Sequence, residues 1–410
     1  MKKCFLSLLL LILLISCFPC FSWSQSGSGS NYSYSVYKDE TAHYNHAYHQ
    51  SLVYKIICDI PEDGDKIYNN FEDVLRSIRG IHNITGGIKQ IVYLVGWQFD
   101  GHDSKYPAWS EVNHRLKRAE DPDALTSFLW LANEAKKYNA CVSVHINMSD
   151  AYMNSPLWEE YLKNDLIVKN QDGSLSKSEF RWGGQQCYWV DKIKEWNTGF
   201  AQKRIDNILK LLPFIKENGT VHIDAFGITG KDDKLLKAVN GILDYWKKNG
   251  VDVTTEYFDF NLAGKIPMVY CLNLTEESRL KYSPAVICGG GSGNTMRNMN
   301  ERKPYAGWAT LPEAGCLFEE AWGVSTYIES LTSQNDGLLK GVVGKLCSET
   351  LQWYLLNRHV AISNYQDTAN YHVTFSDGVE SNVRKWDRYL TIRQGDRLLV
   401  DGEFVFMPAL

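Results

Sequence analysis

Short apolar runs alternate with amphipathic stretches along most of the chain, a pattern typical of strands joined by helices. The clearest strand-like runs are apolar or β-branched, as expected for strands covered on both faces: Gln90–Trp97, Cys141–Asn147, Val221–Ala225, Val251–Tyr257 and Met268–Leu272. Because helical segments separate them, the strands are expected to run parallel. The pattern predicts an α/β fold, a (β/α)8 TIM barrel over residues 46–368.

The helices between these strands have start and stop signals of their own. Asp121-Pro122 predicts a capped helix start, and an apolar stripe of Leu125, Leu129, Ala132 and Ala135 follows at helical spacing. Three further helices are predicted at Phe200–Leu212, Asp232–Asn249 and Leu338–Leu356. The Asn249-Gly250 pair is a typical helix C-cap.

Beyond about residue 369 the helical spacing stops and turn signals become frequent. Asp377-Gly378, Gln394-Gly395 and Asp401-Gly402 supply turns between short strand-like runs. These runs are Tyr371–Phe375, Val379–Val383, Tyr389–Arg393, Arg397–Val400 and Phe404–Phe406. Residues 369–410 are therefore predicted to form a small antiparallel β-rich module.

The N-terminus indicates export. Lys2 and Lys3 precede the apolar run Phe5–Ile15, which is too short to span a bilayer comfortably. Residues 1–24 are predicted to be a signal peptide, and 25–45 a flexible tether that starts Ser/Gly-rich. Leu14-Ile15-Ser16-Cys17 resembles a lipoprotein box that would lipidate Cys17, whereas Ser22-Trp23-Ser24 fits ordinary cleavage. The first is slightly favoured, so we expect a bacterial periplasmic or outer-membrane/cell-surface lipoprotein with membrane contact only through Cys17.

Net charge and cysteine content limit the classes of ligand and binding partner that the chain is expected to have. The 410-residue chain has a net charge of −5, which does not favour a nucleic-acid partner. Ten cysteines less Cys4, Cys17 and Cys20 of the signal region leave seven, with no CxxC spacing among them. That odd number indicates neither a disulfide framework nor a zinc site. We therefore expect a glycan or glycoprotein substrate, no cofactor and no metal, and make no prediction of oligomeric state.

Polar side chains follow four successive strand-like runs. The first run leads to His102-Asp103, and the next three end in His145-Ile146-Asn147, His222-Ile223-Asp224 and Thr254-Thr255-Glu256. The βα loops of a barrel converge at this face, so these side chains are expected to lie together. Alternate residues of a strand share a side, which pairs His145 with Asn147 and His222 with Asp224.

Asp224 and Glu256 are the best candidates for a catalytic acid pair. Their strands are expected to be neighbours, which makes the roughly 5–5.5 Å carboxyl separation of a retaining glycosidase reachable. The nucleophile must be ionised, helped by donors such as His222, and the acid must hold its proton near neutral pH. Either residue alone is more often a helix cap or an ion-pair partner, but the cluster with Asp103 and two histidines favours catalysis.

Four motifs resemble the endo-α-N-acetylgalactosaminidases, family 101 of the glycoside hydrolases. They are Val92–Gln98 with the following Gly101–Ser104, then Val144–Asn147, His222–Gly227 and Thr254–Tyr257. Their order and approximate spacing match the catalytic barrel of that family, and Phe375–Gly378 resembles the start of the β-rich module behind it. The resemblance covers roughly residues 50–410.

The resemblance implies a role for each matching residue. Asp224 takes the place of the nucleophile and Glu256 that of the acid/base, while His102 and Asp103 hold sugar hydroxyls. Further sugar contacts are expected from His145, Asn147, Trp97 and Trp189, with Trp182 as another stacking ring. The family retains anomeric configuration and releases Galβ1-3GalNAc from Ser or Thr of mucin-type glycoproteins.

The sequence also departs from the family. It has no counterpart of the large flanking sandwich and carbohydrate-binding domains. Ala225-Phe226 stands where Val-Trp is expected beside the nucleophile, and Tyr257 replaces a Trp. These changes bear on the disaccharide specificity more than on the chemistry.

Two other functions fit part of the pattern. A metal-dependent amidohydrolase or esterase on the same barrel would take its ligands from His102, Asp103, His145, His222 and Asp224. Against it, the first strand lacks a His-x-His, and Asn147 stands where a second His would serve. The other alternative is a non-catalytic lipoprotein that captures glycans.

Overall fold

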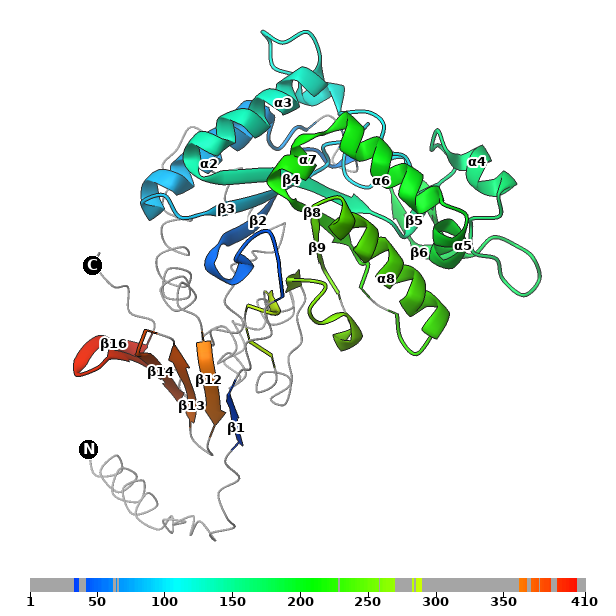
Figure 1. Ribbon diagram of the computed structural model, residues 1–410. Helices are drawn as coiled ribbons and strands as arrows, with labels where there is room; N and C mark the ends of the chain where they lie inside the picture. Colours follow the sequence, from blue (N-terminus) through cyan, green and yellow to red (C-terminus); the bar gives the residue numbers. More distant parts are fainter. Residues whose placement is uncertain are drawn as a thin grey trace, which may run out of the picture.

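A curled parallel sheet is the central element of the structure, a computed structural model that describes residues 33–36, 42–61, 64, 66–227, 229–257, 259–269, 282–283, 285–289, 361–366, 370–375, 377–384 and 389–403. The sheet has seven strands in the order β11-β10-β9-β8-β4-β3-β2 (Figure 1). In chain order they are β2 (Leu52–Ile57), β3 (Gln90–Val95), β4 (Ala140–Asn147), β8 (Thr220–Asp224), β9 (Asp252–Thr255), β10 (Met268–Val269) and β11 (Cys288–Gly289). Each neighbouring pair is parallel.

Burial explains which strands the sequence pattern revealed. All residues of β3, β4 and β9 are buried, and the predicted runs at these positions and at β8 and β10 are confirmed. The pattern missed β2 and β11. β2 is buried along its whole length even though Lys55 interrupts its apolar run.

The sheet curls so that its two ends approach each other. Val53 of β2 and Tyr93 of β3 share one buried cluster with Met268 of β10 and Cys288 of β11. These strands lie at opposite ends of the strand order, so contact between them requires a curved sheet with an enclosed inner face.

Helices cover the outer face of the sheet (Figure 1). They are α2 (Phe71–Thr85), α3 (Ala124–Ala135), α6 (Phe200–Leu211), α7 (Phe214–Asn218) and α8 (Asp233–Lys248). The predicted helices at α6 and α8 are confirmed, and Asp232 caps α8 through its side chain. Short 3-10 turns lie at Tyr48–Gln50, His114–Leu116, Lys136–Tyr138 and Phe260–Leu262.

Helix α3 differs from its prediction in start and in buried face. Asp123, not Asp121, is the N-cap, and its carboxylate accepts a hydrogen bond from Thr126 N at 2.7 Å. Phe128 is buried, whereas Leu129, placed in the predicted stripe, is 37% exposed. The reason is packing, because the Phe128 ring stacks on Phe71 of α2 with centroids 4.8 Å apart.

An insertion between β4 and α6 forms a second, smaller unit. It contains β5 (Asp150–Tyr152), α4 (Trp158–Lys163), β6 (Lys177–Trp182), β7 (Gln185–Trp189) and α5 (Lys192–Asn197). Its three strands pair antiparallel in the order β5-β7-β6. A separate apolar cluster, which includes Trp158, Tyr161 and Tyr188, supports it. Because β5 begins three residues after β4, the insertion starts at the carboxyl edge of the parallel sheet.

A six-stranded antiparallel sheet contains the predicted C-terminal module. Its order is β1-β12-β13-β14-β15-β16. The four predicted strands β13 (Asn370–Phe375), β14 (Val379–Arg384), β15 (Tyr389–Gln394) and β16 (Arg397–Glu403) are confirmed. Two strands come from outside residues 369–410, namely β12 (Ala361–Gln366) and β1 (Ser33–Val36), and β1 lies in the expected tether. The predicted runs Phe404–Phe406 and Leu338–Leu356, and Cys17, lie outside the described residues.

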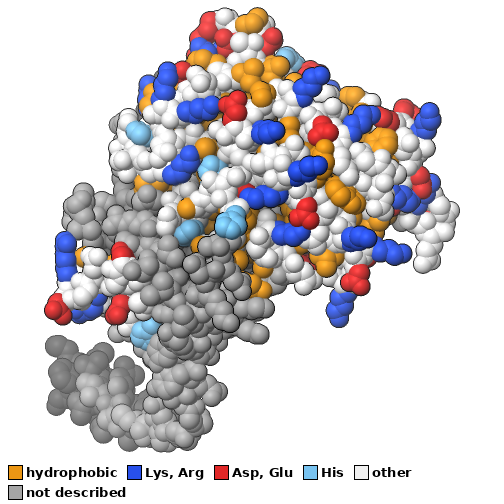
Figure 2. Space-filling model, viewed as in Figure 1, with side chains coloured by type: hydrophobic (Ala, Val, Ile, Leu, Met, Phe, Trp, Pro, Cys, Tyr) orange, Lys and Arg blue, Asp and Glu red, His pale blue; other side chains and the backbone are white. Residues whose placement is uncertain are grey.

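The outer helical face carries charges of both signs. Figure 2 shows Lys and Arg side chains interspersed with Asp and Glu over the helices that face the viewer. Mixed charge of this kind creates no extended field of one sign. Within the described residues, every helix is too short or too polar to cross a membrane.

Candidate active site

The carboxyl ends of the parallel strands open into a cavity of about 340 Å³. We call five residues that lie in, or directly after, the strands β2, β4, β8 and β9 the strand-end floor: Lys55, His145, Asn147, Asp224 and Glu256. Asp150, Ser178, Trp182 and Trp189 come from the insertion, and we call them the inserted wall. The loop after β3 adds His102 and Asp103. Of the residues that the sequence predicted to contact the sugar or assist the reaction, Trp97 and His222 lie outside this lining.

Asp224 and Glu256 lie against each other in this floor. Asp224 ends β8, and Glu256 follows the last residue of the neighbouring strand β9. Their side chains are 16% and 19% exposed, so both reach the cavity. The two carboxyl groups share a hydrogen bond. A pair in such contact fits the roughly 5–5.5 Å separation of a retaining glycosidase better than the 6.5–9.5 Å of an inverting one.

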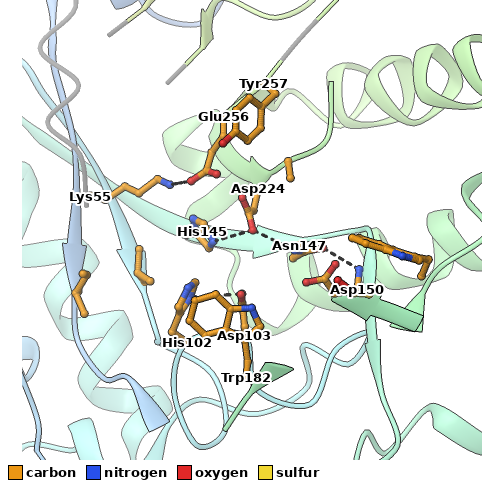
Figure 3. Close-up of a pocket in the computed structure, with 15 residues that line it drawn as sticks. Lys55, His102, Asp103, His145, Asn147, Asp150, Trp182, Asp224, Glu256 and Tyr257 are labelled. Atoms are coloured by element: carbon orange, nitrogen blue, oxygen red, sulfur yellow. Dashed lines mark hydrogen bonds and ion pairs between the residues drawn. The ribbon is translucent and has the colours of Figure 1, made fainter. Parts of the chain in front are cut away.

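The Asp224 carboxyl is held from its other side by Asn147. Asn147 Nδ2 donates to Asp224 Oδ2 at 3.1 Å (Figure 3). The orientation of the Asn147 side-chain amide is fixed, because its Oδ1 accepts hydrogen bonds from the backbone N–H groups of Ser149 at 2.6 Å and Asp150 at 3.0 Å. Burial, followed by the negative charge of Glu256, raises the pKa of Asp224 well above its usual value.

Glu256 has the opposite environment because Lys55 forms an ion pair with it (Figure 3). Burial alone would raise the pKa of Glu256, but the Lys55 ammonium and the hydrogen bond from Asp224 lower it to about 2. The proton of the pair therefore resides on Asp224 in the ligand-free structure. This reverses the expected resting state, in which Asp224 was ionised and Glu256 protonated.

Lys55 is the main charged residue of the cavity that sequence reasoning missed. Its side chain is only 1% exposed on the inner face of β2. The available signal was a lysine within the apolar run Leu52–Ile57. A charge in the middle of a buried strand requires an ionic partner, and only the curled sheet reveals that Glu256 provides it.

The two histidines are buried and neutral. Burial, with the Lys55 charge next, holds the pKa of both His145 and His222 well below the usual value. His145 Nε2 lies 4.0 Å from Asp224 Oδ2, and its ring stacks on His222 at 5.3 Å. His222 lies directly opposite His145 in the β4–β8 pairing, and its Nδ1 is hydrogen-bonded to Thr254 Oγ1 at 2.9 Å. His222 is not part of the cavity lining, and the expectation that it assists the nucleophile stays a prediction.

The loop after β3 is held in a strained conformation. Gly96 has φ +77°, and a Cβ there would lie 2.1 Å from Asp59 O, so only glycine fits. Asp103 itself has φ 52°, a left-handed value that non-glycine residues rarely adopt. Its Oδ1 lies 3.4 Å from His102 Nδ1, and its side chain is 3% exposed. Strain of this kind persists where surrounding structure enforces it, as at ligand sites.

The inserted wall adds aromatic rings and a third carboxyl group. Trp182 meets the His102 ring edge-on at 5.1 Å, and Trp189 pairs with Asp150 across the β5–β7 ladder. Burial, then the negative charge of Asp103, raises the pKa of Asp150 to about 7. Sequence reasoning named Trp182 and Trp189 but missed Asp150, because nothing in the local pattern of β5 marks it.

Trp97 does not line the cavity, which corrects its prediction as a sugar contact. The indole is fully buried, and its Nε1 donates to His145 O at 3.0 Å. Its ring packs near Phe128 of α3. Trp97 therefore supports the backbone that carries His145 instead of touching a ligand.

Two groups of side chains have the geometry to hold a metal ion. Among the described residues they are His102–Asp103–His145 and His145–His222–Glu256, each with its ligand atoms within 4.8 Å of one another. Both use His145, and neither includes Asp224, one of the ligands considered for the amidohydrolase alternative. In the second group Glu256 is already engaged by Lys55.

Similar folds occur in two solved glycosidase structures. The α-N-acetylgalactosaminidase NagBb from Bifidobacterium bifidum, in complex with GalNAc, superposes with a TM-score of 0.59 at 12% identity. The match covers 85% of this chain and 59% of that one. An α-amylase from Geobacillus thermoleovorans, complexed with acarbose, matches with a TM-score of 0.51 at 11% identity over 85% and 87% of the two chains. At these identities the likeness establishes a shared fold.

The sequence itself matches a family profile. Residues 41–264 match the family described as endo-alpha-N-acetylgalactosaminidase. That segment contains β2 to β9 and every residue of the cavity described above. Because it spans more than half of the chain, the protein is a glycoside hydrolase that belongs to the endo-α-N-acetylgalactosaminidase family, family 101 of the glycoside hydrolases.

Proposed function

We propose that the protein is a retaining α-glycosidase that acts on α-linked N-acetylgalactosamine of mucin-type O-glycans, with Galβ1-3GalNAc on Ser or Thr as its substrate. The observation that carries the proposal is the hydrogen-bonded pair of Asp224 and Glu256 on the cavity floor. Two carboxyl groups on adjacent strands, one able to attack and one able to transfer a proton, are what a retaining mechanism requires.

In the first step Asp224 acts as the nucleophile. Its proton must first move to Glu256 along the hydrogen bond between them, which leaves Asp224 ionised and Glu256 protonated. The Asp224 carboxylate then attacks the anomeric carbon while Glu256 protonates the departing glycosidic oxygen. Asn147 keeps the attacking carboxyl in place through its 3.1 Å hydrogen bond.

In the second step water displaces Asp224 from the anomeric carbon of the glycosyl-enzyme. The ionised Glu256 takes a proton from water, the water oxygen bonds to the anomeric carbon, and the bond to Asp224 breaks with its electrons returning to the carboxylate. Attack from the face opposite Asp224 restores the original anomeric configuration. The substrate ring must separate the two carboxyl groups from their present contact to make room for these steps.

The sugar is bound by the groups around the pair. We propose that His102 and Asp103 bind sugar hydroxyls, with His145 and Asn147 beside them, and that Trp182 and Trp189 stack on the glycan. The GalNAc complex of the similar NagBb fold supports an N-acetylgalactosamine residue at this position. Ala225 and Tyr257 line the cavity where the family is expected to have the larger Val and Trp side chains, so the space around the sugar differs.

A panel of aryl α-glycosides tests the proposal. α-Linked GalNAc and Galβ1-3GalNAc should be cleaved, and α-glucosides and α-galactosides should not. NMR of the first product should show the α-anomer, because retention requires it. A β-anomer as the first product would exclude the covalent intermediate on Asp224, and the absence of turnover on both N-acetylgalactosamine substrates would exclude the substrate.

The metal-dependent alternative keeps one supporting observation, the two ligand groups that share His145. His145 is 2% exposed and neutral, as a metal ligand should be. This alternative predicts that a chelator removes activity and that zinc restores it. The glycosidase proposal predicts activity in chelator.

Two further proposals concern the closure of the barrel and the export of the protein. We propose that the curled sheet closes into an eight-stranded barrel, supported by the contact of β10 and β11 with β2 and β3. We also propose export with lipid attachment at Cys17, supported by the charged and apolar N-terminus. Metabolic labelling with a fatty acid, compared between the wild-type chain and Cys17→Ala, tests the second proposal.

A further inference from the structure

We infer that Lys55 is a positioning residue for the second half of the reaction: its ammonium group holds Glu256 as the ionised general base and so favours breakdown of the glycosyl-enzyme over its formation. The inference rests on the proposed retaining function. Lys55 acts through Glu256, and its own bonds do not change during the reaction.

The geometry of the ion pair places Lys55 at the centre of the floor. Lys55 extends from β2 and Glu256 follows β9, two strands separated by β3, β4 and β8 in the sheet order. The pair therefore spans the inside of the curl instead of joining neighbouring strands (Figure 3). With 1% of its side chain exposed, Lys55 has little water around it, so its charge acts strongly on Glu256.

Among the residues that the structure describes, the other titratable groups near Glu256 are one acid and two neutral histidines. Asp224 and His222 of β8 lie next to Glu256, and a ring nitrogen of His145 of β4 lies within 4.8 Å of its carboxylate. Both histidines are neutral because burial holds their pKa values low. The fixed cation in contact with Glu256 within the described residues is therefore Lys55.

The two half-reactions need opposite states of Glu256. Formation of the glycosyl-enzyme needs a protonated Glu256, and Lys55 opposes that state. Breakdown needs an ionised Glu256, and at that stage Asp224 is an uncharged ester that no longer shares a proton with it. Lys55 stabilises the form of Glu256 that breakdown requires, in which a proton passes from water to the Glu256 carboxylate as the bond between sugar and Asp224 breaks.

Lys55→Met separates the two half-reactions experimentally. With 2,4-dinitrophenyl α-N-acetylgalactosaminide the leaving group needs no acid, so kcat/KM, which reports formation, should stay within about 2-fold of wild type. At mildly acidic to neutral pH kcat should fall about 10-fold, because an unpaired buried Glu256 is held protonated. The acidic limb of the kcat profile should move up by about one pH unit or more.

The trapped intermediate gives a readout independent of rate. Intact-protein mass spectrometry of the quenched steady state should show a larger fraction of the glycosyl adduct in Lys55→Met than in wild type. Lys55→Arg, which keeps the charge, should restore kcat in part. Lys89→Met is the matched control and should leave both parameters unchanged, because Lys89 contacts Cys141 Sγ at 3.0 Å at the far end of the strands.

The outcomes distinguish this inference from the proposed function. Parallel losses in kcat and kcat/KM without adduct accumulation would overturn the role of Lys55 while leaving the glycosidase intact. Absence of any adduct and any turnover in wild type would overturn the proposed function itself. If Lys55→Met does not fold, as judged by circular dichroism, Lys55→Gln removes the charge but keeps a hydrogen-bond donor and carries the same expectations.

Discussion

The strand-end floor and the inserted wall surround one cavity but are built in different ways. The floor consists of side chains on the inner face of the parallel sheet, tied together by the Lys55–Glu256 ion pair and the Asn147–Asp224 hydrogen bond. The wall belongs to a three-stranded sheet with its own apolar cluster. The floor therefore inherits the rigidity of the main core, whereas the wall depends on a small unit.

The difference separates chemistry from substrate choice. Proton transfer and nucleophilic attack require groups placed to within fractions of an ångström, which a fully buried sheet provides. Substrate choice requires rings and a few polar groups that differ among relatives, which an insertion on the same scaffold can supply. We therefore expect floor variants to change kcat most, and wall variants to change KM.

The largest effect is expected at the nucleophile of the floor. Asp224→Ala should lower kcat for aryl α-GalNAc by about 10⁴-fold or more, because no covalent intermediate can form. Steady-state kinetics with the wild-type chain and with the surface control Asp396→Asn provide the comparison. Turnover at the wild-type rate would remove Asp224 from the mechanism.

Glu256→Ala should be nearly as severe but should depend on the leaving group. For the natural Ser or Thr linkage the loss should be about 10²–10⁴-fold, since acid assistance is missing. For formation of the glycosyl-enzyme from a dinitrophenyl glycoside the loss should be far smaller, because that leaving group is already acidic. The measurement is kcat/KM across a series of aryl glycosides, and equal losses along the series would argue against an acid role.

Asp150 makes the stability of the inserted wall depend on pH, because its carboxyl group titrates near neutral pH. Its pKa rises from 3.8 to about 7 on folding, so the stability it contributes is complete below 3.8 and is lost as pH rises through about 7. Asp150→Asn cannot ionise and should be more stable than wild type above pH 7, by on the order of 4 kcal/mol at most. Denaturant unfolding at acidic and alkaline pH measures this difference. A constant difference at both values would contradict it.

Trp182→Ala and Trp189→Ala test whether the wall selects the substrate. Each should raise KM about 10-fold, as expected for roughly 1.4 kcal/mol of lost contact, and should change kcat much less. Trp130→Ala is the matched control, because that ring lies on α3 against Arg118 and outside the cavity. A loss confined to kcat would mean that the inserted wall takes part in the chemistry, and would contradict the assignment of substrate selection to the wall and chemistry to the floor.

The smallest effect is expected from metal removal. Dialysis against a chelator should leave kcat/KM unchanged, because the proposed mechanism uses only side chains and water. Assays before and after dialysis, with zinc added back to a second portion, provide the measurement. Loss on dialysis with recovery on zinc addition would favour the groups around His145 as a metal centre.

Much of the site was predictable because its residues follow strands. His102, Asp103, Asn147, Asp224 and Glu256 all come after apolar runs, and parallel strands bring their carboxyl ends to one edge. Trp97 was misplaced since a strand-end position does not say on which side of the sheet a ring lies. Lys55 and Asp150 were missed because their partners are distant in sequence.

The sequence by itself determined the alternation of strands and helices, the antiparallel module and the position of Asp224 and Glu256 at the ends of neighbouring strands. Each of these depends on spacing along the chain, which local periodicity and turn residues encode. Only the tertiary structure decided which carboxyl holds the proton, because that depends on Lys55 of β2 reaching Glu256 after β9 inside the curl. A pKa is set by charges and burial in space, and the sequence separates those two residues by 201 positions.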